Sequence, residues 1–274
     1  MIKLKAALLA GEPVAIDPLR ASAFLQEAEA AQAKFTALDV AGLAALLGTD
    51  QTPPVVEDGV GIVRASGVIG FDLSPLETAL GGLDLAQVNQ DLEALAADPA
   101  VKRVALVMDT PGGSVLGLQE AMGYLAAYPK PTAVFTRGLL ASGGFFYASQ
   151  ADEVISTPGA QVGNAGVYFT VVDSSAAFAA NGLKVEVFRS GDYKAAGTPG
   201  VALTDKQRAE MQESVDEMGA TLRGMTLAKR KFAKASALQG QTYSGRRAAD
   251  LGLITGTANS FAEFLARQKA KAAG

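Results

Sequence analysis

The sequence of 274 residues contains no histidine and no cysteine. These two absences exclude a Ser-His-Asp triad, a thiolate nucleophile, a disulfide and any metal site built on histidine or thiolate ligands. A serine nucleophile in this chain would have to pass its proton to a carboxylate, a tyrosine or a desolvated lysine. No spacing of aspartate and glutamate indicates a metal site, so we expect neither a metal nor a cofactor.

Charge of either sign is also scarce, and long apolar runs are missing. Charged residues make up 19% of the chain, with 24 basic and 28 acidic side chains and a net charge of −4. This balance argues against nucleic acid or anionic lipid as a general partner. The apolar stretch over residues 6–10 is too short for a signal-peptide core or a membrane span. We therefore expect a cytoplasmic protein without a membrane anchor.

Hydrophobic residues make up 49% of the chain, enough for a sizeable buried core. Residues 17–48 carry apolar side chains at helical spacing, and a linker with Pro53 and Pro54 follows them. From there on, strand and helix patterns alternate, which is typical of an α/β fold with a largely parallel sheet. We predict a helical N-terminal appendage over residues 1–52, a main domain over 58–258 and a C-terminal helix or tail over 259–274.

The main domain is expected to contain strands and helices in alternation. Asp84 and Thr204-Asp205 are predicted to cap helices, and the glycine-rich segment 110–113 is interpreted as a turn. The strands are predicted at residues 61–70, 104–108, 132–136, 154–156, 167–172, 185–188 and 253–254, and the helices at 84–98, 115–128, 174–182, 204–231 and 245–251.

Ser142 lies where a buried strand is predicted to turn into a short helix, and Gly143-Gly144 follow it directly. A second glycine pair, Gly112-Gly113, follows another buried strand. Acyl transfer needs backbone N–H groups aimed at a developing oxyanion, and glycine permits the sharp turn and close approach that this requires. Glycine pairs after strands more often serve only as turns, so this pattern alone leaves both interpretations open. Ser114, which follows the second pair, is better explained as a helix cap.

Lys194 is the best-placed base for such a serine. It lies in a segment of small and aromatic residues after the predicted strand 185–188, with Tyr193 beside it and Asp192 as the nearest charge. Burial there would favour a neutral amine, which a general base requires. An ordinary exposed loop lysine is the alternative that the residues by themselves leave open.

Four segments, in this order, resemble the signal peptide peptidase A family of serine peptidases. The resemblance covers roughly residues 58–258. The segments are Thr110-Pro111-Gly112-Gly113-Ser114, Ala141-Ser142-Gly143-Gly144, Gly191-Asp192-Tyr193-Lys194-Ala195 and residues 243–254, which run from Tyr243 to Ile254.

The resemblance implies a Clp-protease/crotonase-like fold and a Ser-Lys dyad, with Ser142 as nucleophile and Lys194 as general base 52 residues later. It also implies an oxyanion hole formed by Gly143 with Gly112 and Gly113. Family members form rings in which the dyad is completed within or between subunits, so a homo-oligomer is implied. The segment Gly163-Asn164-Ala165-Gly166 corresponds to Gly-Ser-Ile-Gly in relatives and is expected to border the substrate cleft.

Within this family, the chain is most similar to the head-maturation proteases of tailed phages and prophages. That similarity implies scaffold or capsid proteins as substrates and a place in the procapsid or the host cytoplasm. The alternatives are a cytosolic bacterial protease like signal peptide peptidase, an inactive assembly protein of the same fold, and a crotonase-type enzyme acting on acyl-CoA.

Overall fold

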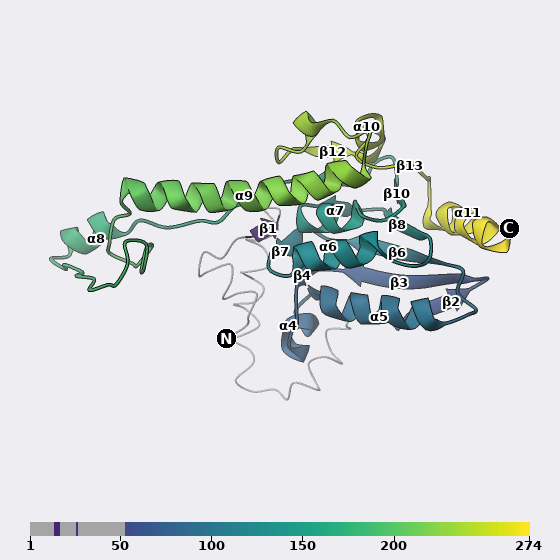
Figure 1. The fold of residues 1–274 in the computed structure, drawn as a ribbon, viewed down its shortest axis with the longest axis horizontal. Coiled ribbons are helices and arrows are strands. Elements are labelled where there is room, and N and C mark those ends of the chain that lie inside the picture. The colour runs from purple at the N-terminus through teal and green to yellow at the C-terminus, as the bar shows by residue number, and fades with distance from the viewer. Residues whose placement is uncertain (1–13, 17–25, 27–52) are drawn as a thin grey trace.

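The computed structural model describes residues 14–16, 26 and 53–274, shown in Figure 1. Apart from Val14–Ile16 and Gln26, the predicted appendage over residues 1–52 lies outside the described residues. The strands are β1 (Val14–Ile16), β2 (Val55–Glu57), β3 (Val60–Ser66), β4 (Val68–Gly70), β5 (Gly82–Asp84), β6 (Arg103–Asp109), β7 (Gly112–Ser114), β8 (Thr132–Thr136), β9 (Leu139–Ala141), β10 (Glu153–Ser156), β11 (Gln161–Gly163), β12 (Thr242–Ser244) and β13 (Gly256–Thr257). The helices are α4 (Pro75–Ala79), α5 (Leu85–Ala97), α6 (Leu118–Ala126), α7 (Gly143–Ala148), α8 (Ser175–Ala180), α9 (Asp205–Lys229), α10 (Gly245–Asp250) and α11 (Phe261–Ala273), with a 3₁₀ turn at Ala235–Ala237.

A six-stranded sheet in the order β13-β10-β8-β6-β3-β2 forms the centre of the molecule. Every neighbouring pair is parallel except β2 with β3, which form an edge hairpin. The hairpin turns at Asp58 and Gly59, both with positive φ, as a tight two-residue turn between twisted strands requires. The predicted α/β fold with a largely parallel sheet is confirmed.

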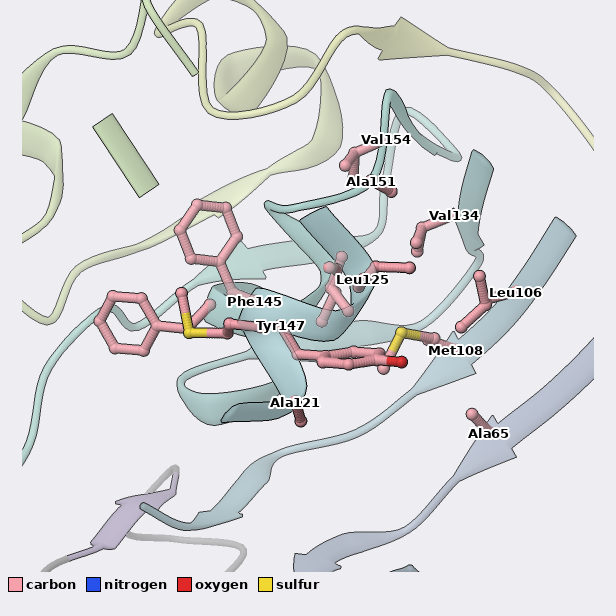
Figure 2. Close-up of a cluster of buried hydrophobic side chains, with 14 of the residues drawn as sticks. Ala65, Leu106, Met108, Ala121, Leu125, Val134, Phe145, Tyr147, Ala151 and Val154 are labelled. Carbon is pink, nitrogen blue, oxygen red and sulfur yellow. The ribbon is translucent and has the colours of Figure 1, made fainter. Parts of the chain in front are cut away.

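The four inner strands β3, β6, β8 and β10 are buried on both faces, and their side chains alternate between two cores. Figure 2 shows the larger core, where Leu106 and Met108 of β6 lie near Leu125 of α6 and Tyr147 of α7. On the other face, Phe135 of β8 stacks on Phe264 of α11, with ring centroids 5.0 Å apart. Each fully buried side chain of this size contributes roughly 1.5–3 kcal/mol, so both helical layers help to hold the sheet.

Two smaller sheets adjoin the central one, in the orders β1-β7-β4-β5 and β12-β11-β9. Val14–Ile16 pair antiparallel with Gly112–Ser114, so this part of the predicted helical appendage is a strand. The predicted turn over 110–113 is wrong in its second half, because Gly112 and Gly113 belong to β7. The strand predicted over 61–70 with a glycine bend is divided at Gly67 into β3 and β4, which belong to different sheets; a side chain at Gly67 would lie 2.2 Å from the carbonyl oxygen of Gly81.

The segment between β11 and α9 leaves the body of the molecule and reaches beyond the N-terminal end of α9 (Figure 1). The predicted helix after Ser174 is confirmed as α8, and Thr204 caps α9 through a capping box with Gln207. The strands predicted over 167–172 and 185–188 are wrong, because these residues form no strand and, apart from a single β-bridge position at Tyr168, are irregular. In the portions that the structure describes, no helix combines the length and apolar character needed to cross a bilayer.

Candidate active site

Ser142 occupies the tight turn between β9 and α7, as predicted from the sequence. Its backbone has φ 54° and ψ −121°, a conformation that residues with a side chain rarely adopt. Strain of this kind persists only where surrounding structure enforces it, and it is concentrated at functional sites. The same strand–turn–helix arrangement presents the nucleophile in α/β-hydrolases.

Neighbouring strands hold this turn in place. The Ser142 N–H donates to the carbonyl oxygen of Gly163 at 2.7 Å, and the Ala141 N–H donates to that of Thr110 at 3.0 Å. A Cβ on Gly144 would lie 2.2 Å from the Thr110 side-chain methyl, so only glycine fits there. The ends of β6, β9 and β11 therefore converge on the serine.

Ser142 is 1% exposed, yet it lines a cavity of about 380 Å³. Its hydroxyl makes no capping bond to α7, although serine at this position usually does. A buried serine that lines a cavity and whose hydroxyl does not cap its helix is arranged for contact with a ligand. The other lining residues are Asn164, Ala165, Gly166, Val167, Tyr168, Gln212, Val215, Asp216, Arg223, Gln239 and Gly240.

The segment Gly163–Gly166, predicted from the resemblance to border the cleft, forms one wall of this cavity through Asn164, Ala165 and Gly166. Asn164 has a positive φ of 52°, and its N–H donates to the carbonyl oxygen of Gln241 at 2.6 Å. These contacts hold the wall against the loop that precedes β12.

The glycines predicted for an oxyanion hole lie on two elements near this turn. Gly143 is the first residue of α7, a position whose N–H has no partner within the helix. The N–H of Gly112 donates to Thr110 Oγ1 at 3.1 Å, so it is already engaged. Gly113 sits in β7 opposite Ile69 of β4, where no side chain would fit.

Lys194 is not among the residues that line the Ser142 cavity, and its side chain is exposed. Its loop is attached to the first turn of α9: Asp192 pairs with Lys206 at 3.5 Å, and its carbonyl accepts from Gln207 at 3.0 Å. Figure 1 shows the chain between α8 and α9 at the N-terminal end of α9, whose opposite end packs on α7. The structure of one chain therefore leaves the two predicted dyad residues apart.

Sequence reasoning did not identify the residues that α9 adds to the cavity. Gln212, Val215, Asp216 and Arg223 share one face of the helix, a spacing that is visible in the sequence. The sequence contains no signal that this face is directed toward Ser142. Within the described ranges, no cluster of three or more acidic side chains could hold a metal ion.

Arg230, just after α9, fastens that helix to the C-terminal end of α7. Its guanidinium donates to the carbonyls of Ser149 at 2.9 Å, Asp152 at 3.4 Å and Ala151. Burial lowers the pKa of Arg230 to about 10, and the nearby Asp152 carboxylate offsets part of that shift. The guanidinium thus stays charged at neutral pH and satisfies buried carbonyls of the turn that follows α7.

Replacing Arg230 with Met should lower the free energy of unfolding by about 2–4 kcal/mol, because several buried carbonyls lose their donor. Urea denaturation measures the change. Lys231→Met is the matched control: Lys231 is exposed, and its loss should change stability by less than about 0.5 kcal/mol. Equal stability of the two variants would show that Arg230 does not hold α7.

Residues 125–273 of the chain match peptidase family S49. This range contains three of the four segments described in the sequence analysis, while Thr110 to Ser114 precede it. Capsid assembly protease C of Escherichia phage lambda is 27% identical over 234 residues, which cover 82% of this chain and 53% of that protein. Protease 4 of Salmonella typhi is 29% identical over 121 residues, which cover 43% of this chain and 19% of that protein.

The chain thus spans about half the length of the phage lambda protein. Among solved structures, an enoyl-CoA hydratase/isomerase family protein from Silicibacter pomeroyi is similar at 16% identity with a TM-score of 0.49. That similarity covers 81% of this chain and 82% of the other.

Proposed function

We propose that this chain, which belongs to peptidase family S49, is a serine endopeptidase using Ser142 and Lys194. The family match confirms the resemblance inferred from its motifs. The observation that carries the proposal is the strained Ser142 at the start of α7, buried except toward a cavity of about 380 Å³. A cavity of this size accommodates a short stretch of a polypeptide.

In the proposed reaction, Ser142 Oγ attacks the scissile carbonyl while the neutral amine of Lys194 accepts its proton. The N–H of Gly143 and one from the Gly112-Gly113 pair stabilise the oxyanion. Lys194 then protonates the leaving amine, and water hydrolyses the acyl-enzyme with Lys194 again acting as base. No cofactor takes part.

A lysine acts as a base only when its surroundings favour the neutral amine, and burial is the usual cause. The exposed position of Lys194 in one chain is compatible with this role if a neighbouring copy covers it. We therefore include in the proposal a homo-oligomeric ring in which the loop of one copy reaches the Ser142 cavity of the next. Exposed apolar side chains on the same extension, Val172, Leu183 and Phe188, support such a contact.

For the biological role, we propose cleavage of scaffold or capsid proteins during procapsid maturation, inside the procapsid or the host cytoplasm. The similarity to the phage lambda protein, which covers 82% of this chain, supports this assignment over a cellular protease.

A fluorophosphonate probe, which reacts with activated serines, tests the nucleophile. We expect it to label the wild-type protein and to label Ser142→Ala at less than about one hundredth of that rate, since only an activated hydroxyl reacts. Ser114→Ala is the matched control, because Ser114 also follows a glycine pair and its hydroxyl accepts the N–H of Leu116 at 3.1 Å. A wild-type protein that the probe does not label would favour an inactive assembly protein.

A further inference from the structure

Arg223 is the only cation among the described residues that line the Ser142 cavity. Its side chain is half-buried, and no hydrogen bond or ion pair joins it to another residue in the part of the chain that the structure describes. Every other long polar side chain in the lining is neutral, apart from Asp216, which accepts a hydrogen bond from Gln212 at 3.0 Å. A partly desolvated guanidinium without a partner leaves five donors available in the cavity.

The Arg223 guanidinium lies against α9 at Gly219. It lies over Gly219, one turn earlier, where an added Cβ would be 2.8 Å from Nη1 and 3.4 Å from both Cζ and Nη2. Glycine inside a helix costs about 1 kcal/mol relative to alanine, so Gly219 is unfavourable for the helix itself. Its missing side chain is what leaves room for the Arg223 guanidinium at this position on the helix.

Gly224, the residue after Arg223, is a natural comparison within the same helix. It is exposed, and an added Cβ there would meet nothing within 4 Å. The two glycines therefore carry the same helical cost, but only Gly219 determines where a cavity side chain lies.

Resting on the proposed peptidase function, we propose that Arg223 binds the carboxylate of an aspartate or glutamate side chain of the substrate, close to the scissile bond. A guanidinium presents two parallel N–H donors, which match the two oxygens of a carboxylate. Arg223 lies one turn from Thr226, whose hydroxyl is 3.1 Å from Ser149 at the end of α7. The cation is thus on the part of α9 that packs against the nucleophile helix.

The test uses the full-length protein and two readouts. A random peptide library is digested and the cleavage sites are sequenced by mass spectrometry, and the same library is enriched by binding to Ser142→Ala, which needs no catalysis. We expect acidic residues near the cleavage site to be preferred over their amides about tenfold or more. Arg223→Gln should bring the ratio of Glu to Gln close to one, and Arg223→Glu should reverse it.

Gly219→Ala should also reduce the preference for acidic residues, because the new methyl group would occupy the position of the Arg223 guanidinium. Gly224→Ala should keep that preference. The preference should weaken as salt is added, since the cavity is open to solvent.

Cleavage with equal use of Glu and Gln by wild type and Arg223→Gln would overturn the inference and leave the peptidase proposal intact. Enrichment of acidic peptides without any cleavage would support the inference and reject the peptidase. If Arg223→Gln instead changes the oligomeric mass and not the preference, Arg223 pairs with another copy and the inference fails.

Discussion

Co-expressed Ser142→Ala and Lys194→Ala chains should recover about one quarter of wild-type cleavage, although each variant alone is inactive. The structure of one chain places Lys194 on an exposed loop that is attached to the first turn of α9, outside the lining of the Ser142 cavity. In a ring with head-to-tail contacts, each site would take its serine from one copy and its lysine from the next. Random mixing of two inactive variants then gives about one intact site in four.

Peptidase assays on the purified mixed complexes measure this recovery. Lys184→Ala mixed with Ser142→Ala is the matched control, because Lys184 is an exposed lysine on the same extension that pairs with Glu186 at 2.7 Å. That mixture should retain the activity of its unmutated serine sites. If the Ser142→Ala and Lys194→Ala mixture stays inactive while wild type cleaves, the dyad is completed within one chain.

Gly113→Ala should abolish probe labelling of Ser142 and lower the free energy of unfolding by about 3 kcal/mol or more. An added Cβ would lie 2.1 Å from the carbonyl oxygen of Ile69 and 2.6 Å from its nitrogen. These are backbone atoms of the neighbouring strand β4, so no side-chain rotation can relieve the clash. β7 would have to separate from β4, which moves the loop that follows β6 and, with it, the contact between Thr110 and the serine turn.

Gly123→Ala provides the comparison for this prediction. Gly123 is an exposed residue of α6 with nothing within 4 Å of an added Cβ, and alanine there should stabilise the helix by about 0.5–1 kcal/mol. Thermal unfolding and probe labelling of both variants distinguish a local clash from a general effect of losing glycine. Normal labelling of a stable Gly113→Ala protein would exclude Gly113 from the site.

Much of the regular structure could be predicted because its signals are local. Asp84 and Thr204 begin helices through side-chain caps that act within three residues, and both helices were predicted with these starts. The strand over 132–136 was predicted with its observed bounds, since an apolar run between prolines and glycine suffices to define it. The strands predicted at 167–172 and 185–188 have suitable side chains, but in the described part of the chain they join none of the three sheets, because pairing is decided by distant parts of the chain.

The same division applies to the candidate site. Without histidine or cysteine, and with Ser142 between a buried strand and Gly143-Gly144, the sequence by itself determined that a serine nucleophile would need a partner other than imidazole. The tertiary structure alone decided that Ser142 is strained and faces a cavity, that Arg223 enters it from a distant helix, and that Lys194 lies outside it. Composition and turn chemistry act over a few residues. The contents of a cavity depend on how α7 and α9 pack, through contacts such as Arg230 with Ser149 that join residues far apart in the chain.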